Sequence, residues 1–147
     1  HSVESFGLES NPYVFKIASA KLKWNTLSIT KIQDTANRLL TNAANVATDI
    51  SNYPPLIVKC FPDNSLHKLD SLKRTCLSME EGEYKDFMWF VITSILRSTS
   101  PVGTAQWQYI QPNKSKANVM DPYDAFKKKI ADICYDIQIS NANESNH

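Results

Sequence analysis

Glycine is scarce in this sequence, with only three residues among 147. No Gly-x-Gly pattern occurs among them, so the chain lacks the tight turn that lets a backbone approach a nucleotide-like cofactor closely. This absence argues against cofactor binding by these residues on their own.

Cysteine is also scarce, and the three residues, Cys60, Cys76 and Cys134, form no Cys-x-x-Cys pair. An odd number without that pairing favours reduced thiols in a cytoplasmic protein over a disulfide framework. Cys60, His67 and Cys76 do not have the spacing of a zinc site, and a fourth ligand is missing. We therefore expect no bound metal.

The sequence has neither a long hydrophobic run nor an excess of charge of one sign. Its most apolar stretch, 87–96, is about half as long as a membrane span, and no signal peptide is visible. Basic residues number 16 and acidic residues 15, so any nucleic-acid-binding surface must be local. These features predict one globular domain in the cytoplasm without membrane contact.

The most informative stretch is at the N-terminus. A short apolar run, 3–8, predicts a strand that ends at the acidic residue Glu9, and Ser10 or Asn11 then caps a helix that Pro12 opens. One face of this helix is formed by residues at helical spacing: Tyr13, Ile17, Ala20 and Trp24. In an open α/β sheet, an acid between a strand and the next helix lies where ligands bind and commonly accepts hydrogen bonds from ribose hydroxyls.

Two sequence blocks carry a resemblance to a known family. The first is Gly-Leu-Glu-Ser-Asn-Pro-Tyr-Val at 7–14, followed by Ala-Ser-Ala-Lys-Leu-Lys-Trp at 18–24. The second is Leu-Arg-Ser-Thr-Ser-Pro-Val-Gly-Thr-Ala-Gln-Trp-Gln-Tyr at 96–109, which continues through 112–114 to 121–126. Both resemble S-adenosylmethionine-dependent DNA methyltransferases, above all the bacterial site-specific modification enzymes that methylate exocyclic amino groups.

The resemblance implies an α/β Rossmann-like methyltransferase fold for the parent protein, and this segment of it is mainly α, with one N-terminal strand and four to five helices. Residues 1–24 then correspond to a strand and helix of the cofactor-binding core, and residues 25–147 to a helical insertion with a long loop at 98–120. The chain begins with His1 rather than methionine, and its strand has no partner nearby. We therefore expect an internal fragment that the remaining portion of the methyltransferase core completes.

The resemblance also implies roles for residues of the first block. Glu9 would accept the ribose hydroxyls of S-adenosylmethionine with charge-assisted strength, and Ser10 and Asn11 would border the adenine. The alternative is that Glu9 is a solvent-exposed acid at the end of a strand. The implied parent reaction transfers a methyl group from S-adenosylmethionine to an adenine or cytosine amino group in double-stranded DNA.

The catalytic motif of the family, a polar residue, two prolines and an aromatic residue, does not occur in this sequence. Near misses at 11–13, 52–56 and 121–123 are better explained as helix caps or breakers, so we assign no catalytic residue. The resemblance places the glycine-rich cofactor loop upstream of this segment and the catalytic motif downstream. This chain alone should therefore be inactive.

Helical periodicity predicts the central part of the chain. Ser28 caps a helix whose apolar stripe continues from Ile29 to Ile50, and Pro54 and Pro55 end it. The run 56–61 predicts a short strand or an extended connector.

The following helices are predicted from caps and apolar stripes. Asp63 or Ser65 caps a helix that continues to Met79, and a helix from Glu83 to Leu96 is so apolar all round that we expect it at the centre of a bundle. The last helix begins at 121–122, and its tail from 140 onward is expected to fray or to lead into a further strand.

The loop 98–120, with the residue before it, is the predicted DNA-contacting segment. Its cations suit phosphates, its amides suit adenine edges and its aromatic rings suit an unstacked base. The candidate residues are Arg97, Trp107, Gln108, Tyr109, Lys114 and Lys116. The alternative is an ordered loop whose aromatic rings fold back onto the helices, and for the whole chain it is a non-catalytic helical module that binds DNA or protein.

Overall fold

The computed structural model describes residues 7–23, 26–103, 116 and 118–144. Within these residues the chain forms six helices and no strand, so the mainly α character is confirmed, but the number of helices exceeds the predicted four to five. The helices are α1 (Pro12–Leu22), α2 (Ile29–Ala43), α3 (Pro55–Cys60), α4 (Asp63–Leu77), α5 (Glu83–Ile95) and α6 (Pro122–Glu144).

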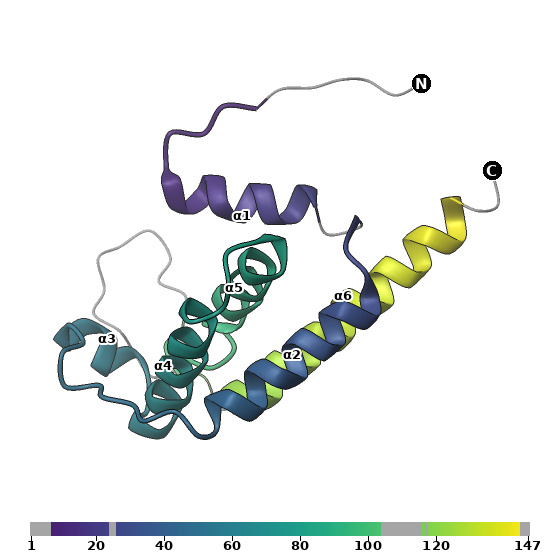
Figure 1. Cartoon of the computed structure of the whole chain (residues 1–147). Coiled ribbons are helices and arrows are strands. Elements are labelled where there is room, and N and C mark those ends of the chain that lie inside the picture. Colours follow the sequence, from purple (N-terminus) through teal and green to yellow (C-terminus); the bar gives the residue numbers. More distant parts are fainter. Residues whose placement is uncertain (1–6, 24–25, 104–115, 117, 145–147) are drawn as a thin grey trace.

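Four of these helices, α2, α4, α5 and α6, form the four-helix unit (Figure 1). Helix α2 packs on α4 and α6, and α5 packs on the same two helices from the other side. The side chains between them are at most 2% exposed: Ile32, Leu39, Leu72, Phe87, Met88, Val91, Phe126 and Ile137. Their spacing on each helix produces one continuous apolar core.

Helix α5 lies at the centre of this arrangement, as its apolar sequence predicts. It contacts α4, α6 and α2, and α1 lies across its remaining side (Figure 1). Because its surroundings are protein on several sides, it buries Phe87, Met88, Val91, Ile92 and Ile95.

Helix α2 begins after Ser28 as predicted but ends at Ala43 rather than continuing to Ile50. Asn45 turns its side-chain amide back to the Thr41 carbonyl at 2.8 Å, a local bond that competes with helix propagation. The apolar spacing beyond Ala43 is therefore carried by irregular backbone.

The expected strand or connector at 56–61 is wrong, because α3 forms there. Pro55 occupies the first turn, where its fixed φ suits a helix, and the backbone N–H groups of Ile57 and Val58 donate to the Pro54 carbonyl at 2.8 and 3.2 Å. None of the α3 residues is buried, so the helix adds little to the core.

The ends of the chain also differ from expectation. Helix α6 continues to Glu144, past the position where we expected fraying. The predicted strand at 3–8 lies mostly outside the described residues, but its last two residues, Gly7 and Leu8, are in no strand. No described strand is available to pair with them, and Leu8 is fully exposed.

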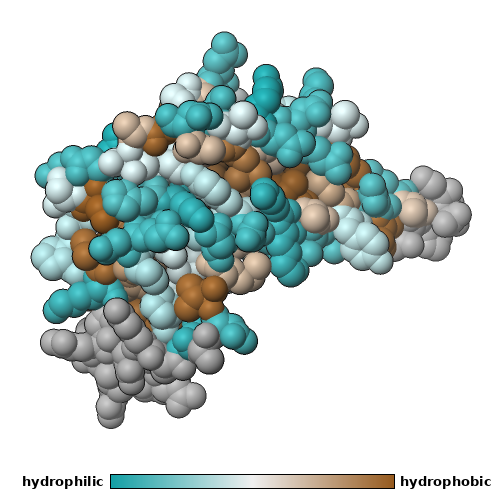
Figure 2. Space-filling view, turned by 90° about the horizontal axis from the view of Figure 1, so that it is seen from below, coloured by the Kyte–Doolittle hydropathy of each residue, from teal (hydrophilic) through white to brown (hydrophobic). Residues whose placement is uncertain are grey.

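The face of the molecule that is seen from below, relative to the view of Figure 1, has a mixed hydropathy. Figure 2 shows hydrophilic residues over most of this face, with hydrophobic residues in separate groups between them. Among the helices of the described residues, none combines the length and the hydrophobicity that a membrane span requires.

Candidate functional site

The predicted cofactor residues lie at the N-terminal end of α1. The Glu9 carboxylate accepts a hydrogen bond from the Asn11 backbone N–H through Oε1, at 2.8 Å. Asn11 caps the helix, because its Oδ1 accepts from the backbone N–H groups of Tyr13 and Val14 at 2.9 and 3.3 Å. The local sequence therefore fixes where α1 begins and holds the acid beside its positive end.

Glu9, Ser10 and Asn11 are all exposed and follow one another along the backbone. Asn11 uses its side-chain oxygen as the cap, whereas Glu9 keeps a carboxylate at the surface that could accept hydroxyl hydrogens. The predicted role of Asn11 beside an adenine therefore competes with its role in the helix.

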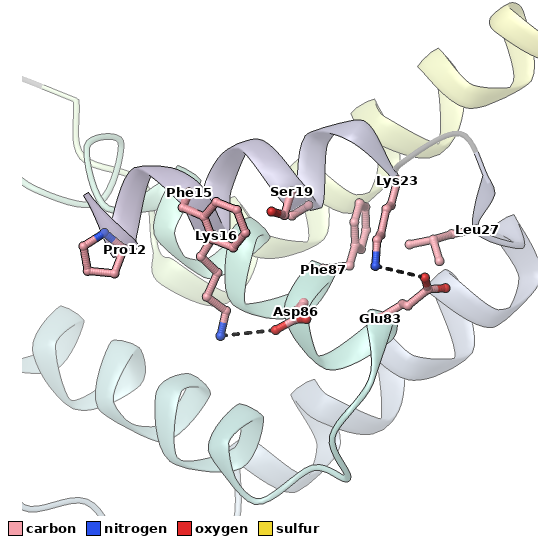
Figure 3. Close-up of a pocket in the computed structure, with 10 residues that line it drawn as sticks. Pro12, Phe15, Lys16, Ser19, Lys23, Leu27, Glu83, Asp86 and Phe87 are labelled. Carbon is pink, nitrogen blue, oxygen red and sulfur yellow. Dashed lines mark ion pairs between the residues drawn. The ribbon is translucent and has the colours of Figure 1, made fainter. Parts of the chain in front are cut away.

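A cavity of about 340 Å³ lies between α1 and α5 (Figure 3). Phe15, Ala20, Leu27 and Phe87 supply its apolar wall. Its volume is at the lower end of the range for small-molecule pockets. The sequence did not predict this cavity, since its walls come from segments about 70 residues apart and no motif joins them.

Two ion pairs cross the rim of this cavity and connect the helices (Figure 3). Lys16 Nζ lies 3.2 Å from Asp86 Oδ1, and Lys23 Nζ lies 3.3 Å from Glu83 Oε1. Each of these side chains is between 40% and 57% exposed, so water screens both pairs.

Trp89 adds an aromatic contact to the same interface. Its ring meets the Tyr13 ring edge-on, with the centroids 5.5 Å apart, and Lys16 Nζ lies 4.7 Å from the Trp89 centroid. Lys16 thus interacts with both an acid and an aromatic ring of α5.

The opposite side of α1 carries an apolar stripe without a described partner helix. Val14, Ala18 and Leu22 follow one another at spacings of four, and Phe15, which also lines the α1–α5 cavity, borders this stripe. Val14 is 42% exposed, Phe15 57% and Leu22 81%. The sequence shows this spacing of four, but the apolar helix face predicted from it is the one that contains Ala20.

Two of the predicted DNA-contacting residues lie within the described residues. Lys116 Nζ donates to the backbone carbonyls of Arg97 and Ser100 at 2.5 and 3.3 Å, and the Lys116 N–H donates to the Pro101 carbonyl at 3.1 Å. The Lys116 ammonium therefore stabilises the chain after α5, while Arg97 is exposed at the surface. The other candidates, Trp107, Gln108, Tyr109 and Lys114, lie outside the described residues.

Hydrogen bonds also fix the start of the 98–120 segment against the helices. Ser100 Oγ donates to the Cys60 carbonyl at the end of α3, at 2.6 Å. Met120 N–H donates to the Ser98 carbonyl at 3.0 Å, which brings the two ends of the segment together. This agrees with an ordered base for the loop.

A buried polar cluster covers one side of α4. Asp70 is 2% exposed and accepts hydrogen bonds from Tyr53 Oη at 2.7 Å and from Arg74 Nε at 2.6 Å. Partial burial, together with the bond to Asp70, raises the pKa of the Tyr53 phenol. No spacing in the sequence indicates the Tyr53–Asp70 contact, because these residues are 17 positions apart with α3 between them.

A second polar contact joins α4 to the start of α6. Lys68 pairs with Asp121, and Ser71 Oγ lies 2.8 Å from Tyr123 Oη. Asp121 Oδ1 also accepts from the Tyr123 backbone N–H at 2.9 Å, which makes it the cap that we predicted. Burial alone would raise the pKa of Asp121, but the hydrogen bonds from Lys68 and from the Tyr123 N–H outweigh it and lower the pKa.

The described residues contain no group of three or more His, Cys, Asp or Glu placed to hold a metal ion. The three cysteines are free thiols, and burial raises the pKa of Cys76 to about 11. This thiol is therefore a core residue and not a nucleophile.

The chain matches no protein-family model, no curated protein and no solved structure. The predicted resemblance to DNA methyltransferases therefore stays a prediction from the two sequence blocks.

Proposed function

We propose that this chain is a segment of an S-adenosylmethionine-dependent DNA methyltransferase that methylates an adenine or cytosine amino group. In this proposal α1 lies between a Rossmann-like cofactor-binding core and the four-helix unit. The observation that carries it is the apolar character of α1 on two opposite faces, only one of which α5 covers.

The exposed stripe of α1 supports a missing neighbouring layer. In α/β folds a helix that follows a strand covers a face of the sheet with its apolar side. Leu22 is 81% exposed, so covering it would contribute up to roughly 1.5–3 kcal/mol, and covering the partly exposed Val14 would add a smaller amount. This gain favours docking on such a sheet.

Glu9 would bind the cofactor ribose in the complete protein. Its carboxylate is exposed and directly precedes α1, and the hydrogen bond from the Asn11 N–H fixes one of its oxygens. A preorganised carboxylate can accept two hydroxyl hydrogens with charge-assisted strength. Ser10 would border the adenine through the neighbouring backbone.

Double-stranded DNA would bind at the segment that follows α5. Arg97 is exposed where this segment begins and is suited to a phosphate, as is Lys114 further on. The Lys116 ammonium supports the base of the segment through its bonds to the Arg97 and Ser100 carbonyls. We propose Trp107, Gln108 and Tyr109 as the residues that face the bases.

The cofactor role is tested by calorimetric titration of S-adenosylmethionine into a protein that joins this segment to its flanking sequence. Glu9→Ala should weaken binding by the worth of one or two charge-assisted hydrogen bonds, about 1.5–3 kcal/mol each. Glu9→Gln should lose part of that energy, because the amide keeps one acceptor oxygen. Asp34→Ala, an exposed acid on α2, is the matched control and should change nothing.

If Glu9→Ala leaves the dissociation constant of S-adenosylmethionine unchanged, Glu9 does not bind the cofactor. The flanking gene sequence separates the broader alternatives. A glycine-rich loop upstream and a two-proline aromatic motif downstream would support the methyltransferase, whereas neighbouring sequence without both motifs would favour a non-catalytic helical module.

The DNA contact is tested by salt-dependent binding of the same protein to duplex DNA. Arg97→Glu and Lys114→Glu should each flatten the dependence of log K on log salt by about one unit, since each removes a phosphate contact. Lys127→Glu on α6, whose lysine lies 3.7 Å from Asp124, is the control of equal charge change. An unaltered slope would argue for a structural loop.

A further inference from the structure

Helix α1 is attached to the four-helix unit without belonging to its core. The described core cluster contains residues of α2, α4, α5 and α6 together with Leu27, but no residue of α1. Ala20 is the one buried side chain that α1 contributes among its described residues. Its attachment therefore depends on a separate, smaller set of contacts.

Those contacts combine a small apolar surface around Ala20 with ion pairs that are exposed to water. The two ion pairs join Lys16 of α1, and Lys23 that directly follows α1, to residues 86 and 83 of α5. The Lys16 ammonium adds its contact with the Trp89 ring. Exposed pairs of this kind contribute little each and weaken as salt rises.

The face of α5 beneath α1 has the properties of a helix-binding groove. Phe87 and Trp89 supply aromatic surface, and Glu83 and Asp86 supply two negative charges beside it. Helix α1 faces this surface with the buried side chain of Ala20, and Lys16 and Lys23 pair with the two acids. The two sides are complementary in charge.

We infer that this face of α5 is a reversible docking site for a helix with two lysines seven residues apart, and that α1 occupies it. Helix α1 can leave the site while the four-helix unit stays folded, because the core cluster of α2, α4, α5 and α6 contains no residue of α1. The inference goes beyond the proposed methyltransferase function, since it concerns how two parts of this chain are held together and requires no cofactor.

Hydrogen exchange of the full chain tests the inference, with amides 16–22 of α1 compared with those of α2 and α5. The double variant Lys16→Glu, Lys23→Glu should speed exchange in α1 by about tenfold, since it replaces two attractive pairs by repulsion. Exchange in α2 should not change. Lys21→Glu is the control, because it makes the same charge change at an exposed position of α1 that takes part in neither ion pair.

Charge exchange provides the rescue. Adding Glu83→Lys and Asp86→Lys to the double variant should restore slow exchange in α1. Raising the salt concentration should speed α1 exchange in the unmodified chain without any substitution, so the inference stays testable even if a variant folds poorly.

Three results would overturn the inference. They are α1 exchange that is insensitive to salt, an equal effect of Lys21→Glu, and α1 amides that open together with those of α2 under every condition. The last result would make α1 a part of the cooperative core.

Discussion

Helices α1 and α5 lie against each other and are both apolar around much of their circumference, yet they differ in how much of their apolar surface is buried. Helix α5 buries five large apolar side chains, whereas α1 buries only Ala20 and exposes Phe15 and Leu22. The difference comes from the number of neighbours, since α5 contacts four helices and α1 packs mainly on one. Apolar residues around a helix thus predict how many partners it needs, but not whether the described chain supplies them.

The sharpest test of this comparison replaces one phenylalanine in each helix. Phe87→Ala should lower the free energy of unfolding by about 3–5 kcal/mol, because it opens a cavity in the core. Phe15→Ala should change it by less than about 0.5 kcal/mol, since its ring is 57% exposed. Urea unfolding of both variants measures the difference, and equal losses would contradict the assignment of α1 to the periphery.

A second test removes the buried carboxylate of α4. Asp70→Ala should cost about 1–3 kcal/mol, because Tyr53 loses its acceptor and the segment before α3 loses one of its hydrogen bonds to α4. Asp34→Ala, an exposed acid in α2, is the control. If both variants unfold at the same urea concentration as the unmodified chain, the polar cluster does not stabilise the unit.

A third test concerns the lysine at the junction of α4 and α5. Lys85 is 9% exposed and donates to the carbonyls of Leu77 and Met79, each at 3.0 Å, so it satisfies the end of α4. Lys85→Met keeps the apolar stem and should cost about 1–3 kcal/mol. Lys128→Met, at an exposed pair with Asp132, should lie near zero in the same thermal unfolding experiment.

The smallest expected effect is a pH dependence at the α4–α6 junction. The pKa of Asp121 is lower in the folded state than its ordinary value of 3.8, so its contribution is present above that value and is lost as the pH falls through the folded pKa. Asp121→Asn should reduce the loss of unfolding free energy at acidic pH by less than about 1 kcal/mol. Unfolding curves between pH 5 and about pH 2 compare the two proteins, and parallel curves would show that the Lys68 contact is not linked to protonation.

Local signals in the sequence predicted most helices of the fold. Proline and a polar cap located the starts of α1 and α6. The predicted helix before Met79 forms as α4, but its N-cap is Pro62, so Asp63 and Ser65 lie inside the helix and neither caps it. Helix α3 was missed because its valine and isoleucine suggested a strand. Pro54 and Pro55 instead favour the start of a helix at this point. The length of α2 was overestimated because the apolar spacing continues into a segment with its own turn bonds.

The candidate site was predictable only where it is local. The position of Glu9 before a capped helix follows from five consecutive residues, and the structure has this arrangement. The α1–α5 cavity, the Asp70 cluster and the anchoring of Lys116 involve residues from distant segments, whose contacts are set by packing. Periodicity assigns a face to each residue, but it does not say which charged residue of another helix lies opposite.

The pairing of α2 with α6 has a consequence for the synthesis of the chain. The buried stripe of α2 is complete once Ala43 has been added, but α6 does not begin until Pro122. At about 5–20 residues per second, Ile32 and Leu39 would wait roughly 4–16 seconds for the helix that covers them. During that interval α4, and then α5, can shield this surface, so the early contact of α2 with α4 protects the nascent chain from association with other chains.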